Sequence, residues 1–234
     1  MNYLNSTKNL FNLILFIFPF VILYKLIAFF KFKNMPYQIR NTADIIIRDF
    51  ISYFSPDVMT FYSLFLFFFL SLYILYNYKI QKTYIFNLYY TLMMYIEGII
   101  WGFLLVFIIN GKSFFVSSFT MNSDYLLSFY YCIGASIWEE VLFRLICISI
   151  LIFIFSKIKI NKNVNIIMSI ILSSVLFSIF HYIGSMGDVF SLYTFFYRFV
   201  GGVYLSILYY YRGIGISMMS HFIYDFILVT VPFY

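Results

Sequence analysis

The chain has 234 residues, of which 64% are hydrophobic, 25% aromatic and only 10% charged, and its mean hydropathy is +0.94. Soluble domains carry about 25% charged residues, so these values exclude a water-soluble globular protein. The formal net charge of +6 is modest and is spread over short polar segments, which indicates contact with a lipid bilayer and argues against a nucleic-acid partner. We therefore expect a multi-pass integral protein of the cell membrane.

Apolar segments follow one another along the whole chain. A helix needs about 20 apolar residues to cross the hydrocarbon core, and continuous apolar runs favour helices over barrel strands, whose residues would alternate. Seven segments meet this requirement: Leu10–Phe30, Val58–Tyr78, Tyr84–Asn110, Tyr125–Phe155, Val164–Ile183, Val189–Tyr211 and Ile214–Val231. The fourth is too long for a single span, which a kink or an interfacial turn at its start would explain.

The polar segment between the first two spans has helical periodicity of its own. Arg40, Asp44 and Arg48 recur every four residues among isoleucines and phenylalanines, which predicts an interfacial helix over Arg40–Phe54 that lies on the membrane. No internal repeat or low-complexity linker is visible. We therefore expect an all-α fold, a polytopic transmembrane helix bundle of about seven spans that forms one membrane domain over residues 1–234.

Ionisable residues inside apolar spans are the most informative ones. Each costs about 2.5–3.5 kcal/mol at the centre of a membrane helix on insertion scales, so a protein keeps few of them without a use. The third to seventh predicted spans contain eight: Glu97, Glu139, Glu140, Arg144, His181, Arg198, His221 and Asp225. Both histidines of the chain are in this set.

Two pairs of these residues are spaced four apart, which places each pair on one helix face. Arg144 can hold the Glu140 carboxylate ionised and fix its rotamer. Glu139 is rotated by about 100° from Glu140 around the helix axis, so it can face a cavity while its neighbour binds the arginine. His221 and Asp225 can project together into the same interior space.

Phe177 lies one turn before His181, where it is expected to wall this space against lipid. Taken singly, each pair is also explained as a structural contact between helices, and His181 as an interfacial residue. Their co-occurrence is harder to explain in that way, because carboxylates, histidines and a donor for an oxyanion are the groups that activate a carbonyl for attack. The set therefore predicts an active site.

Three short motifs carry these residues. Residues 139–144 read EEVLFR, an EExxxR pattern; residues 177–181 read FSIFH, an FxxxH pattern; and residues 221–225 read HFIYD, an HxxxD pattern. In this order, on three late helices, they resemble the CAAX protease and bacteriocin-processing family (CPBP, or Abi) of intramembrane proteases, which includes the type II CAAX prenyl endopeptidase. The resemblance covers residues 125–231, which would carry the catalytic core.

The resemblance implies an endopeptidase that works in the membrane without a serine or cysteine nucleophile. Its substrates would be membrane-associated peptides, either prenylated CAAX-type peptides or leader and signal peptides. Glu139 and His181 would activate the attacking water, with Glu139 passing the proton to the leaving amine, and Phe177 would line the substrate site. The supporting residues would be an orienting pair, Glu140 with Arg144, and an oxyanion pair, His221 with Asp225.

Asp225 stands where the family accepts Asn or Asp. An asparagine can donate to an oxyanion, whereas an ionised aspartate cannot, so Asp225 must be protonated, orient His221 or bind a metal. The use of a metal stays open: His181, His221 and Glu139 are a sufficient ligand set for zinc with an open fourth position. The HExxH spacing of zinc proteases is absent, which favours water activated by glutamate.

Two other functions fit some of the same residues. A proton-coupled transporter would use the buried acids as an ion path, but no inverted repeat is visible. A catalytically silent membrane scaffold, such as a bacteriocin-immunity protein, would keep the fold without turnover. Outside the site, we expect Glu97, next to a Gly98-xxx-Gly102 close-packing motif, to be a helix-packing contact. We expect Arg198 to bind a structural partner or a lipid headgroup.

The predicted depths of the two histidines differ. Glu139 and His181 each lie about 18 residues, or roughly 27 Å, from one membrane face. His221 lies only about nine residues, or roughly 13 Å, from Arg212 on the same side. The two histidines can meet only if the turn at residues 212–215 is inset or the last helix is tilted.

Overall fold

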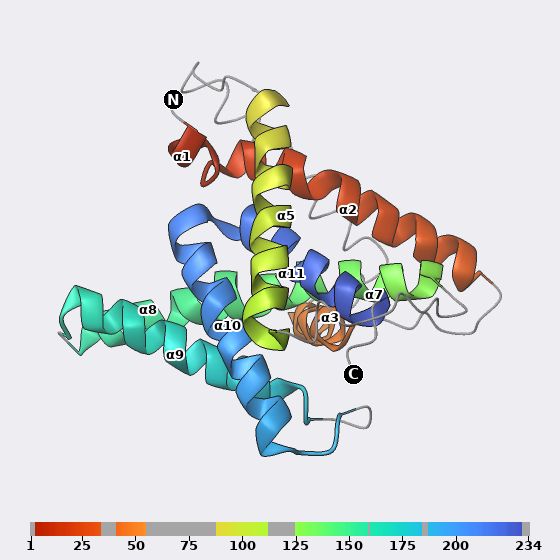
Figure 1. Cartoon of the computed structure of the whole chain (residues 1–234). Helices are drawn as coiled ribbons and strands as arrows, with labels where there is room; N and C mark the ends of the chain where they lie inside the picture. Colours follow the sequence, from red (N-terminus) through yellow and green to blue (C-terminus); the bar gives the residue numbers. More distant parts are fainter. Residues whose placement is uncertain are drawn as a thin grey trace.

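Helix α11 (Ile214–Thr230) lies at the centre of the bundle in the computed structural model (Figure 1). It packs against α2 (Leu10–Lys31), α5 (Leu88–Asn110), α7 (Tyr125–Glu139) and α10 (Leu192–Arg212). Every residue from Ile214 to Phe222 is buried. A helix that is enclosed on all sides needs apolar or fully paired polar groups around its whole circumference, so the polar side chains of α11 must find partners inside the bundle.

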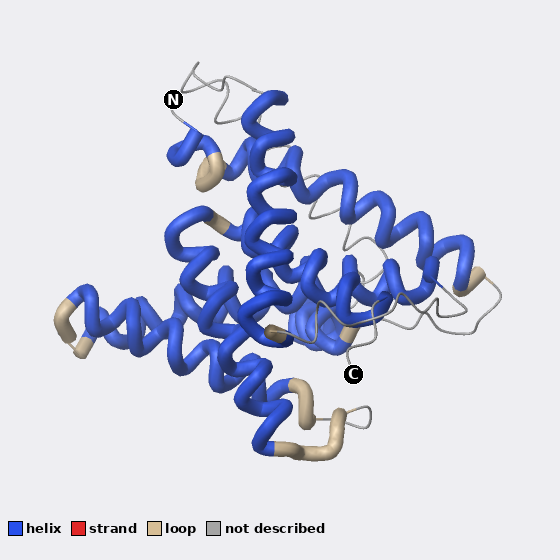
Figure 2. The backbone as a smooth tube through the Cα atoms, in the orientation of Figure 1, coloured by secondary structure: helices blue, strands red, loops and turns tan. Residues whose placement is uncertain are grey.

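The structure describes residues 3–33, 41–54, 88–111, 125–158, 160–183 and 187–230. Within these ranges all regular elements are helices (Figure 2), which confirms the predicted all-α fold. Three described helices are long and apolar enough to cross a membrane, at Asn12–Lys31, Leu88–Asn110 and Lys162–Phe180. The remaining elements are α1 (Tyr3–Ser6), α3 (Thr42–Phe54), the π-helix η1 (Glu140–Cys147), α8 (Ile148–Lys157) and α9 (Lys162–Phe180).

Most predicted helices agree with the observed ones to within a few residues. The predicted span Val58–Tyr78 lies outside the described residues. The over-long fourth span is helical from Tyr125 onwards and contains an eight-residue π-helical segment rather than an interfacial turn at its start. A π-helix closes each hydrogen bond over one more residue than an α-helix, and Ser173 of α9 also donates to the Phe143 carbonyl of this segment at 2.8 Å.

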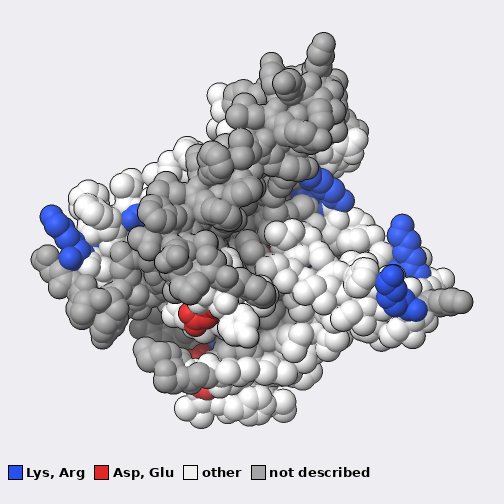
Figure 3. All heavy atoms as spheres, turned by 180° about the vertical axis from the view of Figure 1, so that it is seen from behind, with Lys and Arg blue, Asp and Glu red and all other residues white. Residues whose placement is uncertain are grey.

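Helix α3 is confirmed, but Asp44 and Arg48 face the protein. Asp44 is fully buried, lies 2.6 Å from Arg48 Nε and accepts a hydrogen bond from Tyr24 at 3.3 Å. Large apolar side chains such as Phe50 and Tyr53 are exposed instead. Asp44 and Arg48 neutralise each other inside the bundle, and the exposed positions of α3 carry several large apolar side chains and one acid, Asp49. The described part of the face in Figure 3 is mostly uncharged, with a few Lys, Arg, Asp and Glu side chains.

Helices α5 and α11 approach each other closely at two glycines. A Cβ atom on Gly98 would lie 2.5 Å from Met219 Cβ, and one on Gly102 would lie 2.6 Å from Ile223 Cβ. Only residues without a side chain allow this approach, which confirms the predicted close-packing motif. His221 lies between Met219 and Ile223 in the sequence, so this contact positions the part of α11 that carries it.

The turn between α10 and α11 is covered by the N-terminal segment. Gly213 is buried and has a φ of 89°, and a Cβ on it would lie 2.8 Å from the Thr7 carbonyl oxygen. Lys8 Nζ donates to the Tyr210 carbonyl at 2.9 Å. The turn is therefore packed beneath the N-terminal segment of the chain.

Candidate active site

A cavity of about 250 Å³ is enclosed by helices α5, α7, α9, α10 and α11. Its polar lining includes Glu139, His181, Arg198, His221 and Asp225. Residues from all three predicted motifs thus share one cavity, although they come from helices that are far apart in the sequence. Apolar side chains supply most of the remaining wall, so charges inside the cavity interact in a poorly hydrated environment.

Glu140 lies behind the cavity wall and is fully buried. Its Oε1 atom is 2.9 Å from His221 Nδ1 and 3.1 Å from Arg144 Nη1. Its Oε2 atom accepts a hydrogen bond from the Ser217 hydroxyl at 2.6 Å. A buried carboxylate without such partners would be strongly destabilising. Both oxygens of Glu140 are paired and join η1 to α11, and the predicted Glu140–Arg144 ion pair is present. The three guanidinium nitrogens of Arg144 are buried and form no hydrogen bond within the described residues.

The hydrogen bond to Glu140 determines which ring nitrogen of His221 faces the cavity. A carboxylate that is paired with an arginine only accepts hydrogen bonds, so Nδ1 of His221 is the donor. The other nitrogen, Nε2, lies 3.4 Å from Asp225 Oδ2 and 3.9 Å from Glu139 Oε2. Both distances are longer than an ordinary N–H···O hydrogen bond, which leaves Nε2 available to a water or a substrate.

His181 is oriented in the same way by a backbone group. It follows the last residue of α9, and its Nδ1 atom lies 2.9 Å from the Phe177 carbonyl oxygen. A carbonyl oxygen only accepts, so Nδ1 carries the proton and the unprotonated Nε2 can bind a water. Both histidines of the cavity are thus oriented through Nδ1.

Glu139 has a partner that sequence reasoning missed. Its Oε1 atom accepts a hydrogen bond from Asn41 Nδ2 at 2.9 Å, while Asn41 Oδ1 accepts from the backbone N–H of Ala43 at 2.8 Å. The second contact is an N-cap of α3, which the position of an asparagine directly before a helix could have indicated. The first depends on α3 lying against α7, and no sequence signal specifies that.

Phe177 separates Arg144 from the cavity. The Arg144 guanidinium is fully buried and lies 4.4 Å from the centre of the Phe177 ring, a cation–π distance. The same ring is 4.9 Å from the ring of His181 and 6.1 Å from that of His221. Phe177 therefore packs between the basic groups of the site, and with 5% of its surface exposed it forms part of the cavity wall, as expected.

Arg198 has the structural partner that was predicted, because it pairs with Asp188. It also lines the cavity beside the two histidines, a location that its sequence context did not reveal. Ser217, which donates to Glu140, was likewise missed. Serines are frequent in membrane helices as packing residues, so Ser217 did not stand out in the sequence. Arg198 belongs to none of the three motifs, so its sequence context indicated only a structural contact.

Glu97 belongs to a separate polar cluster, as expected for a helix-packing contact. Arg212 binds both of its oxygens, through Nε at 2.5 Å and Nη2 at 2.6 Å. Tyr3 donates to Oε2 at 2.5 Å and Trp101 to Oε1 at 3.2 Å. Burial and the bond to Glu97 raise the pKa of the Tyr3 phenol above its ordinary value, which keeps it protonated as a donor. This cluster joins α1, α5 and α10.

The proposed zinc ligands His181, His221 and Glu139 line the same cavity. Within the described ranges, however, no three His, Cys, Asp or Glu side chains have the arrangement of a metal site. The observed geometry therefore does not fit a zinc ion unless these side chains rearrange.

Residues 121–227 match the family model described as type II CAAX prenyl endopeptidase Rce1-like. This segment contains all three motifs and every helix of the cavity except α5. Comparison with curated proteins and with solved structures returns no match. The match, together with the cavity that the three motifs share, identifies residues 121–227 as an Rce1-like segment, which supports assignment to the CAAX protease (CPBP) family.

Proposed function

We propose that the protein is a multi-pass endopeptidase of the cell membrane that cleaves membrane-associated peptides with a water activated by Glu139 and His181. The observation that carries this proposal is the single cavity to which all three motifs contribute. The Rce1-like match over residues 121–227 supports CAAX-type protease activity in general terms. The roles of individual residues rest on the hydrogen bonds that orient Glu139, His181 and His221.

The first step is attack of water on the scissile carbonyl. A water bound to Nε2 of His181 and to the Glu139 carboxylate gives its proton to Glu139 as its oxygen forms a bond to the carbonyl carbon. The carbonyl electron pair moves onto the oxygen to give a tetrahedral oxyanion. Asn41, which donates to the other oxygen of Glu139 at 2.9 Å, holds the carboxylate in place. Glu139 then protonates the leaving amine as the carbon–nitrogen bond breaks.

The oxyanion requires a donor, and Nε2 of His221 supplies one when the ring is protonated. Glu140, Asp225 and Glu139 surround this imidazole at 2.9, 3.4 and 3.9 Å, and their negative charge favours the imidazolium form. The position of Asp225 beside His221 favours an orienting role for the aspartate over direct donation. Ser217 and Arg144 hold Glu140 in turn, so the donor is positioned before the substrate binds.

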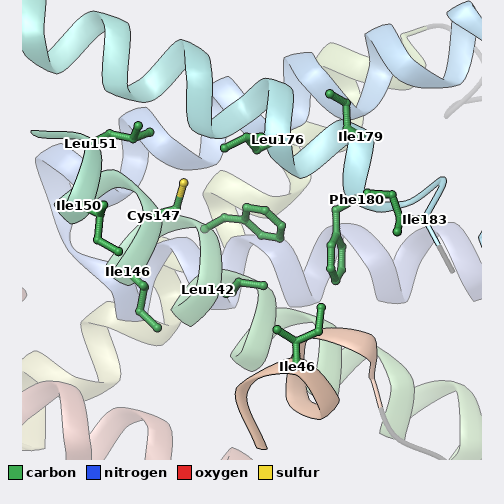
Figure 4. Close-up of a pocket in the computed structure, with 11 residues that line it drawn as sticks. Ile46, Leu142, Ile146, Cys147, Ile150, Leu151, Leu176, Ile179, Phe180 and Ile183 are labelled. Atoms are coloured by element: carbon green, nitrogen blue, oxygen red, sulfur yellow. The ribbon is translucent and has the colours of Figure 1, made fainter. Parts of the chain in front are cut away.

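An apolar pocket next to the site suits a substrate with a lipid or apolar chain. It has a volume of about 470 Å³ and is lined entirely by apolar side chains and Cys147. Figure 4 shows that they come from η1, α8, α9 and Ile46 of α3. Phe143 and Phe180 line this pocket and contact Phe177 and His181 of the cavity, with ring centres 5.4 and 6.2 Å apart. Prenylated CAAX-type peptides are therefore the first substrates to test.

The proposal is tested with purified full-length protein in lipid nanodiscs. An S-farnesylated CAAX-type peptide with a quenched fluorophore is the substrate, and Glu139→Ala and His181→Ala are the test variants. Removing either group should lower turnover by about 10²–10⁴-fold, the usual contribution of a general base. Lys162→Gln, a change at the exposed start of α9, serves as the control. Unchanged turnover in both test variants would overturn the mechanism, and inactive wild-type protein would favour a silent scaffold.

The metal question needs its own measurement. Elemental analysis of the active protein before and after mild chelation shows whether zinc is bound in stoichiometric amounts. Under the glutamate mechanism, turnover should persist after chelation. Loss of stoichiometric zinc together with activity would replace that mechanism by one in which His181, His221 and Glu139 bind the ion.

A further inference from the structure

Arg198 brings a permanent positive charge to the cavity. Among the described residues of the cavity wall it is the only lysine or arginine, and a guanidinium stays protonated in proteins. Arg144, the other arginine of the site, is kept out of the cavity by the ring of Phe177. Arg198 therefore supplies a charge that neither the motifs nor the water-activating residues account for.

The guanidinium of Arg198 is held in place on one side. Its Nη2 atom pairs with Asp188, and its Cζ atom lies 5.1 Å from the centre of the Tyr182 ring, within cation–π range. The hydroxyl of Tyr182 is in turn hydrogen-bonded to Thr194 Oγ1 at 2.8 Å. These contacts fix the direction of the planar group without occupying all of its donors.

The other terminal nitrogen, Nη1, has no acceptor among the described residues. Nη1 of Arg198 is buried and has no hydrogen-bond partner in the part of the chain that the structure describes. A buried donor without a partner is costly, so an acceptor from outside the chain would stabilise it. Glu139 and Asp225 line the same cavity, but neither forms an ion pair with Arg198 among the described contacts. The acceptor that is missing can therefore enter with the substrate.

We propose that Arg198 binds a carboxylate of the substrate and so positions the peptide bond next to Glu139 and His181. This inference rests on the proposed peptidase function and adds the chemical group of the substrate, a carboxylate, that the site recognises. Guanidinium groups bind carboxylates through parallel N–H···O bonds, which fix both distance and orientation. A cavity of about 250 Å³ holds only a short piece of chain, so the carboxylate lies close in sequence to the bond that is cut.

Two carboxylates of a peptide have this chemistry: the free C-terminus and the side chain of Asp or Glu. Three farnesylated peptides of otherwise equal sequence distinguish them. The first ends in a free carboxylate, the second ends in an amide, and the third ends in an amide but carries an aspartate as its last residue. A preference for the first identifies the chain end, and an equal preference for the first and third identifies any nearby carboxylate.

Binding is measured first, independently of cleavage, because the two proposals can fail separately. Full-length Glu139→Gln protein in nanodiscs is titrated with each peptide. The same titration is repeated with three double variants, in which Glu139→Gln is combined with Arg198→Gln, Arg198→Lys or Lys162→Gln. We expect the carboxylate form to bind about tenfold or more tighter than the amide, as for a charged hydrogen bond. Arg198→Gln should abolish this ratio, Arg198→Lys should keep part of it, and Lys162→Gln should leave it unchanged.

A merely structural role for Arg198 would weaken binding of all peptides equally and leave the ratio intact. A ratio that survives Arg198→Gln would overturn the inference, and so would equal or absent binding of the acid and amide forms. Turnover of the wild-type protein is scored separately. A carboxylate preference without turnover would contradict the peptidase proposal alone, whereas turnover without a preference would contradict the role of Arg198 alone.

Discussion

Glu139 and Glu140 are neighbours in the sequence but are bound from different parts of the bundle. Glu139 lines the cavity and accepts a hydrogen bond from Asn41, which caps α3. Glu140 is fully buried and is bound by Arg144 of its own π-helix and by His221 and Ser217 of α11. The first carboxylate is therefore available to a water, whereas the second holds helices together.

The two glutamates should respond differently to the same substitution. Glu140→Gln leaves Arg144 as a buried, unpaired charge, and breaking a buried ion pair costs about 3–5 kcal/mol, so we expect a clearly lower melting temperature. Glu139→Gln keeps the bond from Asn41 and should leave the melting temperature nearly unchanged while abolishing turnover. Thermal unfolding in detergent, followed by intrinsic fluorescence, gives the comparison. Equal destabilisation by both variants would contradict the separation of roles.

Asn41 can be tested without disturbing the helix that it caps. Serine is a good N-cap residue, so Asn41→Ser keeps the bond to Ala43 but removes the donor to Glu139. We expect α3 and the melting temperature to be retained and turnover to fall by about three- to tenfold, the effect of losing about one ordinary hydrogen bond. Asn41→Ala, which loses both contacts, is the matched comparison. A turnover equal to wild type in Asn41→Ser would show that Glu139 needs no orienting partner.

The glycines of α5 should be sensitive to a single methyl group. A Cβ on Gly98 or Gly102 would lie 2.5–2.6 Å from the Cβ of Met219 or Ile223, so alanine forces α5 away from α11. Overpacking of this kind costs about 1–3 kcal/mol. Gly201→Ala is the control for stability, because its Cβ would meet only Ile109 Cδ1, at 3.4 Å. Melting temperatures that fall equally in all three variants would contradict the close-approach argument.

The cluster around Glu97 should support stability rather than chemistry. Glu97→Gln weakens its two bonds from Arg212, and bonds to charged groups contribute about 1.5–3 kcal/mol each, so we expect a lower melting temperature. Tyr3→Phe removes one bond only and should have a smaller effect. In both variants the protein that stays folded should keep the turnover number of the wild type. A reduced turnover number at full folding would place Glu97 in the catalytic machinery.

The apolar pocket can be narrowed from its lipid-facing side. Ile150 lines the pocket and is 51% exposed, so Ile150→Trp should be tolerated and should fill part of the space. We expect the KM for a farnesylated peptide to rise severalfold with kcat nearly unchanged, because apolar binding is lost without a change at the reacting atoms. Phe153→Trp, also exposed on α8 but outside the described pocket lining, is the control. An equal KM in both variants would separate this pocket from substrate binding.

The helices and the motif residues of this protein could be predicted from the sequence alone. Long apolar runs have only one low-energy form in a bilayer, because backbone hydrogen bonds must be satisfied within the helix. Ionisable residues stand out within such apolar runs, which is why the sequence indicates Glu139, His181 and His221 as candidate site residues. The spacing of Glu140 and Arg144 also predicted their pairing correctly.

The tertiary structure decided which groups complete the site. Asn41 reaches Glu139 because α3 packs against α7, and Arg198 reaches the cavity because α10 packs along α9 and α11. No short-range pattern in the sequence specifies those contacts. The inward direction of Asp44 on α3 and the packing of the turn at Gly213 beneath the N-terminal segment have the same origin. A sequence determines helices and their polar residues through local hydrogen bonding and hydrophobicity, whereas the partner of each polar residue depends on how whole helices pack.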